Sequence, residues 1–176
     1  MPLPQLMPLL VAVTIARCLA PVKAQLDDLY RWQMSQQELR SPREIISQKG
    51  RFTDGLYQKL RRAYALDPAM TPGRFLDFDP FSGTQVNTYG AKVLGCTALP
   101  GGGMEALVAV QAHLRNRLSE APQKLRYQLV MDPAGTWKIA DIVYSDQVSD
   151  PRPTESRRLT SLLAELLDPN SRKNSY

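Results

Sequence analysis

Residues 132–144 read DPAGTWKIADIVY, a reverse turn that leads into a strand. Pro133 suits the first central position of the turn because its ring holds φ near the value needed there. Asp132 suits the position before it, and Gly135 suits the exit. We therefore predict a hairpin, in which the strands on either side of the turn run antiparallel.

The residues on both sides of this turn alternate between polar and apolar side chains. Residues 124–131 precede the turn, and residues 136–144 follow it with Trp137 and Ile139 on the apolar face. A period of two places one face of each strand on a hydrophobic core. Asp141 interrupts the apolar face of the last strand, which a β-bulge or a polar contact in a pocket would each explain.

Two further strands are predicted ahead of this hairpin, at residues 89–99 and 105–115. They are joined by Pro-Gly-Gly-Gly at residues 100–103, which we interpret as a turn. A phosphate-binding loop would need a Lys-Ser or Lys-Thr pair and a following helix. His113, the only histidine, shares the polar face of the second strand with Gln111. We therefore do not expect His113 to act in catalysis.

Four other segments show apolar side chains at helical spacing. They are residues 25–36, 41–50, 53–67 and 154–167. Thr53 is suited to cap the third helix, and Ser41 to cap the second. Helices followed by an antiparallel meander predict an α+β domain, with three N-terminal helices on one face of a sheet of about four strands.

The first 24 residues differ in character from the rest of the chain. Residues 6–16 are apolar and uncharged, too few to span a bilayer as a helix but suited to the core of a signal peptide. Val22 and Ala24 occupy the small-residue positions that signal peptidase reads, so Gln25 is the predicted mature N-terminus. We expect export to the periplasm or the cell exterior, or to the thylakoid lumen in a photosynthetic host, with no membrane span after signal removal.

The chain has 176 residues, a length suited to one domain. We expect residues 1–24 as the signal peptide, 25–150 as the folded domain, and 151–176 as a C-terminal helix with a polar tail. The basic residues form scattered doublets rather than a stripe, and the net charge of +5 falls when the signal peptide leaves. Nucleic-acid binding is therefore not expected.

Cys18 and Cys96 are the only cysteines. Removal of residues 1–24 would leave Cys96 alone, so we expect no intramolecular disulfide and interpret Cys96 as a small core residue. Lipidation of Cys18 is the alternative, disfavoured because Arg17 stands where lipoproteins have a small residue. With one histidine and one mature cysteine, we expect no metal site, and no motif calls for a cofactor.

The order of elements, with WKIADI at residues 137–142, resembles the nuclear transport factor 2-like, or cystatin-like, superfamily. Residues 52–64, and Asp-Pro-Phe at residues 79–81, are similar to a bacterial exported domain family of unknown function. The resemblance covers residues 25–145. It implies three helices against a strongly bent sheet, forming a cone with a cavity at its open end. Relatives use the cavity as an isomerase or dehydratase site, or to bind a ligand or protein.

The candidate pocket residues are aromatic and acidic side chains that this resemblance places near the cavity. They are Tyr57, Tyr64, Asp77, Phe78, Asp79, Phe81, Trp137 and Asp141. A carboxylate pair of Asp77 and Asp79 in an apolar pocket would raise the pKa of one member and create a general acid or base. We favour the alternative, in which Asp79 turns the chain before Pro80 while Phe78 and Phe81 fill the core.

Three functions remain in view. The favoured one is an exported, non-enzymatic binding module that holds a small apolar ligand or a partner protein in the cone. The second is an isomerase or dehydratase that uses Asp77 or Asp79 with a tyrosine. The third is an envelope interaction or assembly factor that docks through the leucine-rich helix at residues 154–167. For that helix, packing back on its own domain is the expectation.

Overall fold

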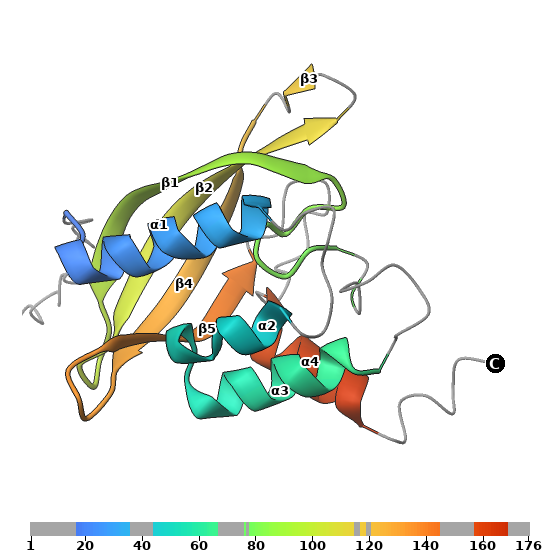
Figure 1. Cartoon of the computed structure of the whole chain (residues 1–176). Helices are drawn as coiled ribbons and strands as arrows, with labels where there is room; N and C mark the ends of the chain where they lie inside the picture. The colour runs from blue at the N-terminus through green and yellow to red at the C-terminus, as the bar shows by residue number, and fades with distance from the viewer. Residues whose placement is uncertain are drawn as a thin grey trace, which may run out of the picture.

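The computed structural model describes residues 17–35, 44–66, 76, 78–114, 117–118, 121–144 and 157–168. They form an antiparallel sheet packed with helices (Figure 1), so the predicted α+β class is confirmed. The long strands are β1 (Asn87–Ala98), β2 (Met104–Leu114), β4 (Gln123–Met131) and β5 (Trp137–Tyr144). The short strands are β3 (Arg117–Leu118) and β6 (Arg157–Arg158). The sheet order is β1-β2-β4-β5-β6, with β3 pairing with β2.

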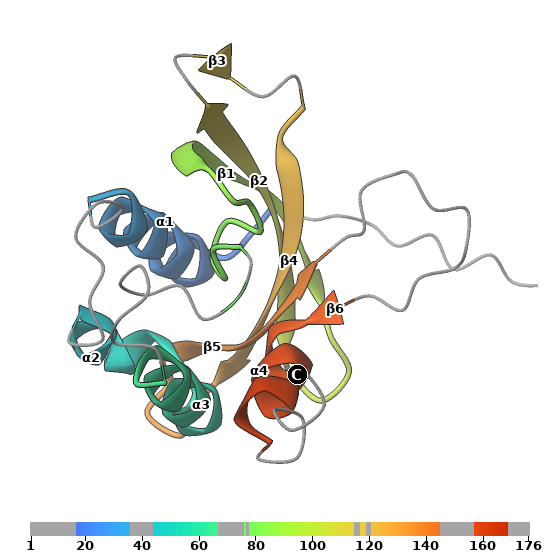
Figure 2. The ribbon, with the colours of Figure 1, turned by 90° about the vertical axis from the view of Figure 1, so that its right-hand side faces the viewer.

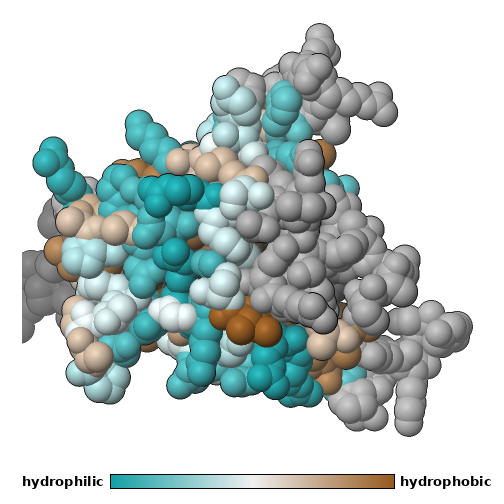
Figure 3. Space-filling view, viewed as in Figure 1, coloured by the Kyte–Doolittle hydropathy of each residue, from teal (hydrophilic) through white to brown (hydrophobic). Residues whose placement is uncertain are grey.

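The described helices are α1 (Ala20–Ser35), α2 (Glu44–Ser47), the 3-10 turn η1 (Lys49–Arg51), α3 (Asp54–Tyr64) and α4 (Leu159–Leu167). Helices α1, α2 and α3 lie on one side of the curved sheet (Figure 2). α1 packs on β1 and β5, α3 packs on β5, and α4 packs on both α3 and β5. The side of α1 that faces away from the sheet is mainly hydrophilic (Figure 3), as expected for an amphipathic helix on a core.

The β4–β5 hairpin and the start of α3 have the local geometry that the sequence predicts. The Gly135 N–H donates to the Asp132 carbonyl at 2.9 Å, and Gly135 has a φ of 79°. The Asp132 carboxylate accepts the N–H groups of Ala134 and Thr136 at 3.0 and 2.8 Å, which closes the turn. Thr53 caps α3 by accepting the Leu56 N–H at 3.4 Å.

A β-bulge in β5 resolves the polar interruption at Asp141. Asp141 pairs with Gln128 and Ile139 with Leu129, so Ala140 is an extra residue opposite the β4 ladder. The extra residue moves Ile142 to the same face as Ile139, and both side chains are fully buried. Asp141 is thereby placed on the other face. Of the two explanations offered for the polar interruption at Asp141, the structure shows the β-bulge.

The N-terminal part of the fold differs from the expectation in two ways. α1 begins at Ala20, not at residue 25, so the predicted signal-peptide boundary falls inside a helix that packs on the sheet. The interpretation of Cys96 as an unpaired core residue is wrong, because Cys96 forms a disulfide with Cys18. The bond ties the segment before α1 to β1.

The C-terminal helix packs on its own domain, as expected. Leu159 and Leu163 are fully buried, while Leu162 and Leu166 are partly buried against the core. α4 begins at Leu159, later than predicted, and the short strand β6 that precedes it was not predicted. Part of the predicted helix, residues 154–156, lies outside the described residues.

Candidate functional site

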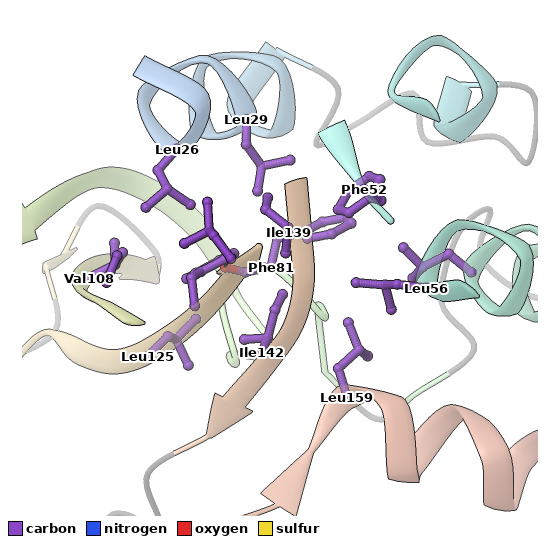
Figure 4. Close-up of a cluster of buried hydrophobic side chains, with 14 of the residues drawn as sticks. Leu26, Leu29, Phe52, Leu56, Phe81, Val108, Leu125, Ile139, Ile142 and Leu159 are labelled. Atoms are coloured by element: carbon purple, nitrogen blue, oxygen red, sulfur yellow. Dashed lines mark hydrogen bonds between the residues drawn. The ribbon is translucent and has the colours of Figure 1, made fainter. Parts of the chain in front are cut away.

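Phe81, which the resemblance places near the cavity at the open end of the cone, lies in the middle of the core. Its side chain is 1% exposed and lies among residues of α1, β4 and β5 (Figure 4). Its ring stacks on Phe52 with centroids 5.9 Å apart and forms a T-shaped contact with the Trp32 ring, with centroids 5.8 Å apart. Phe81 therefore fills this interior space with the chain's own side chain.

The loop that carries Phe81 is closed by its own hydrogen bonds. The Asp79 N–H donates to the Thr84 carbonyl at 2.9 Å, and the Gly83 N–H donates to the Asp79 carbonyl at 2.8 Å. Gly83 has a φ of 67°, and a Cβ there would lie 3.1 Å from Cδ2 of Leu125. Glycine is therefore required by both the backbone conformation and the contact with β4.

Three buried tyrosines hold this loop through its carbonyl oxygens. The hydroxyls of Tyr30 and Tyr127 lie 2.8 and 2.9 Å from the Phe81 carbonyl oxygen and 2.9 Å from each other. The Tyr144 hydroxyl donates to the Pro80 carbonyl at 2.8 Å. Each hydroxyl has one hydrogen, so Tyr30 and Tyr127 share their two hydrogens among the three contacts of this triangle.

Burial raises the pKa of all three hydroxyls above the usual tyrosine value. For Tyr30, the loss of solvation by burial is the main cause, and the hydrogen bond with Tyr127 opposes it. For Tyr127 and Tyr144, the pKa is raised first by burial and then by the charge of a neighbouring tyrosine. These hydroxyls therefore stay protonated at neutral pH and serve as hydrogen-bond donors to the loop.

The acidic candidates do not form a catalytic pair in the described residues. Oδ1 of Asp79 accepts the N–H groups of Phe81 and Ser82 at 2.8 and 3.0 Å, so this carboxylate shapes the loop. Asp77 lies outside the described residues. The geometry of Asp79 agrees with the favoured interpretation, in which it turns the chain.

Asp141 anchors α4 rather than lining a cavity. Its Oδ1 accepts the Thr160 N–H at 3.0 Å, and its Oδ2 accepts the Thr160 hydroxyl at 2.8 Å. Arg158 donates to Oδ2 at 3.3 Å. Because the Thr160 N–H lies in the first turn of α4, a strand side chain here caps the helix in place of a residue of the helix's own segment.

The aromatic candidates are dispersed through the core. Tyr57 and Tyr64 are buried on α3, and the Lys49 ammonium lies 5.9 Å from the centre of the Tyr57 ring. Phe78 is half-buried, with its ring 5.0 Å from that of Tyr144. Trp137 is buried at the start of β5. These side chains stabilise the core and do not converge on one cavity.

A hollow in the described surface lies beside the β4–β5 hairpin, and we call it the hairpin hollow. Its volume is about 410 Å³, and it opens to solvent. It is lined by Lys49, Gly50, Phe52, Thr53, Asp54, Val130, Asp132 and Lys138. Lys138 donates to the Gly50 carbonyl and lies 3.7 Å from Oδ2 of Asp132, so it fastens η1 to the hairpin.

A second hollow of about 410 Å³ lies between α1 and the same hairpin. It is lined by Pro21, Ala24, Gln25, Asp28, Arg51, Gly135, Thr136 and Trp137. Gln25 donates to the Trp137 carbonyl at 3.0 Å and accepts from Arg51 at 3.2 Å. Among the predicted pocket residues that the structure describes, Trp137 alone lines one of these two hollows.

One position in the strand pattern of β4 is a sequence signal of the hairpin hollow. Val130 shares its strand face with Lys124, Arg126 and Gln128, so an apolar side chain stands at a position where the pattern calls for a polar one. In the structure Val130 is 40% exposed and the adjacent Met131 is 52% exposed. Of the two large apolar side chains that line the hollow, Val130 is the exposed one, since Phe52 is 2% exposed.

The two lysines and two aspartates of the hairpin hollow balance in charge. The hollow therefore has no strong preference for an anion or a cation. Within the described part of the chain, no group of three or more His, Cys, Asp or Glu residues could hold a metal ion. None of the described helices is both long and apolar enough to cross a membrane.

Comparisons with protein-family models, with curated proteins and with solved structures find no match to this chain.

Proposed function

We propose that this protein is an exported, non-enzymatic binding module of the nuclear transport factor 2-like kind, which binds a partner polypeptide at the hairpin hollow. The observation that carries the proposal is the burial of Phe81 in the middle of the core. A small apolar ligand in the interior of the cone would have to displace this ring and break the contacts of its carbonyl with Tyr30 and Tyr127. The outer surface therefore offers the better binding site.

The chemistry of the hairpin hollow supports a polypeptide partner. Val130, which lines the hollow and is 40% exposed, offers apolar surface for one side chain of the partner. Lys49 and Asp54 are both exposed and can pair with charges of either sign beside that side chain. A balanced set of charges around an apolar centre resembles the rim and core of a protein interface.

An isomerase or dehydratase role has less support. The carboxylate of Asp79 already holds two backbone N–H groups, and the nearby tyrosine hydroxyls donate to carbonyl oxygens of the loop. A docking role for α4 also has less support, since Leu159 and Leu163 are buried in the protein's own core.

The test is native mass spectrometry of the protein purified from the exported fraction of its own host. We expect a mass that includes a second polypeptide. Val130→Lys should abolish this complex, because it places a charge in the apolar centre of the hollow. Leu94→Lys is the matched control, since Leu94 is a strand residue of similar exposure, 45%, on β1.

Two other outcomes of this experiment would contradict the proposed binding site. A retained small molecule would favour a ligand pocket over a protein interface. A complex that survives Val130→Lys but not Leu94→Lys would place the interface on β1 and overturn the proposed site.

A further inference from the structure

The disulfide between Cys18 and Cys96 conflicts with signal cleavage after Ala24. It joins residues 78 apart in sequence, with Cα atoms 4.8 Å apart. Cys96 is buried in β1, and Cys18 packs against the core. Cleavage after Ala24 would discard Cys18 and leave Cys96 as a lone buried thiol.

The same cleavage would remove part of the core. Val22 is 0% exposed and lies on the buried face of α1 together with Leu26 and Leu29. The new N-terminus at Gln25 would also place a positive charge in the first turn of the shortened helix. The N-terminal end of the helix dipole is positive, so this charge would be unfavourable.

An earlier bond avoids both losses. Thr14 and Ala16 are small residues at the spacing that signal peptidase reads, and residues 6–13 before them form an uncharged apolar core. Cleavage after Ala16 leaves Arg17 as the first residue, ahead of Cys18 and of the whole of α1.

We propose that the Ala16–Arg17 bond is the maturation site, and that the mature protein keeps Cys18 for its disulfide with Cys96. The proposal rests on the export that forms part of the proposed function. It is independent of where the protein binds a partner.

Two chemical steps follow. A signal peptidase adds water across the Ala16–Arg17 peptide bond, giving a carboxylate on Ala16 and an α-amino group on Arg17. The thiols of Cys18 and Cys96 then lose two protons and two electrons to the disulfide of a thiol oxidoreductase, which is reduced to a dithiol. Sγ of Cys18 is used in this bond, so it cannot also carry a diacylglyceryl thioether.

The experiment expresses the full chain in an exporting host and determines the N-terminal sequence and intact mass of the exported product. Thiols are alkylated with and without prior reduction. We expect an N-terminus at Arg17, no alkylation before reduction, and two alkylated cysteines after it. An N-terminus at Gln25 with one reactive thiol, or a lipid on Cys18, would overturn the proposal.

Two variants provide a matched comparison. Ala16→Leu places a large residue at the position next to the proposed bond and should cause the precursor to accumulate. Ala24→Leu changes an exposed residue of α1 and should leave processing unchanged. The reverse result would restore cleavage after Ala24. An uncut chain in the exported fraction would overturn the maturation site alone, whereas an uncut chain with free thiols inside the cell would also overturn export.

Discussion

Phe81 lies at the centre of the core, and its own carbonyl oxygen accepts hydrogen bonds from the tyrosine hydroxyls of α1 and β4. Phe81 thus stabilises the core in two ways, through the packing of its ring and through the hydrogen bonds that its carbonyl accepts. Its position follows from the turn at Asp79, which directs the chain inward. An apolar side chain in this loop was predictable, but the partners of its carbonyl were not, because they come from strands and helices far along the chain.

Phe81→Ala should lower the free energy of unfolding by about 3–5 kcal/mol, since it leaves a cavity among rigid neighbours. Urea unfolding measures this loss. We also expect the variant, unlike the wild type, to bind a small apolar probe such as benzene or xenon. Phe78→Ala is the control, because Phe78 is half-buried and its loss should cost less. Equal losses for the two variants would contradict a central role for Phe81.

The buried tyrosines should make stability fall at alkaline pH. Their pKa values are raised in the folded state, so above about pH 10 the unfolded chain releases tyrosine protons that the folded chain retains. The contribution of these tyrosines to the free energy of unfolding is therefore constant below this range and decreases above it. Tyr127→Phe should make the decrease shallower, whereas Tyr89→Phe, at a side chain 64% exposed, should not. Urea unfolding between neutral and alkaline pH decides this, and an identical slope for both variants would contradict it.

At the scale of elements, β5 and α4 are joined by one carboxylate. The bulge at Ala140 turns Asp141 away from the core, toward Thr160 of α4. No capping side chain within the segment of α4 supplies this contact, since Arg158 at the N-cap makes no such hydrogen bond. The interruption at Asp141 in an otherwise apolar strand face is the sequence signal of this anchor.

Asp141→Ala should lower the free energy of unfolding by about 2 kcal/mol, because the first turn of α4 loses its acceptor. Thr160→Val should cost about 1 kcal/mol. The double variant should cost less than the sum of the two, since both remove the same contact. Arg158→Ala, at an exposed side chain, should cost under about 1 kcal/mol. Additive losses at Asp141 and Thr160 would show that the two residues act separately.

For the whole molecule, the sequence predicted what is determined locally. The turn at Asp132 and Gly135 and the cap at Thr53 depend on neighbours within a few residues, and both are observed. The start of α1 at Ala20 and the pairing of β6 with β5 depend on distant partners, and neither was predicted. The hairpin hollow also combines local and long-range features. Val130 is predictable from its strand pattern, whereas the contact of η1 with the hairpin depends on residues far apart in sequence.

Replacement of both cysteines, Cys18→Ser with Cys96→Ser, should lower the free energy of unfolding by about 2–5 kcal/mol. The disulfide closes a loop between residues 78 apart, so it restricts a large part of the unfolded chain. Denaturant unfolding should place the double variant level with the reduced wild type. If the double variant were as stable as the oxidised wild type, the disulfide would make no contribution to the free energy of unfolding.

The presence of two cysteines also limits which non-native disulfides can form during oxidative folding. One intramolecular pairing exists, so there are no scrambled isomers to sort and no need for a disulfide isomerase to reshuffle bonds within the chain. Any non-native disulfide formed by this protein alone must therefore join two molecules. Dilution should therefore be enough to favour the correct product on refolding, and non-reducing electrophoresis would show the misfolded fraction as covalent dimers or larger oligomers.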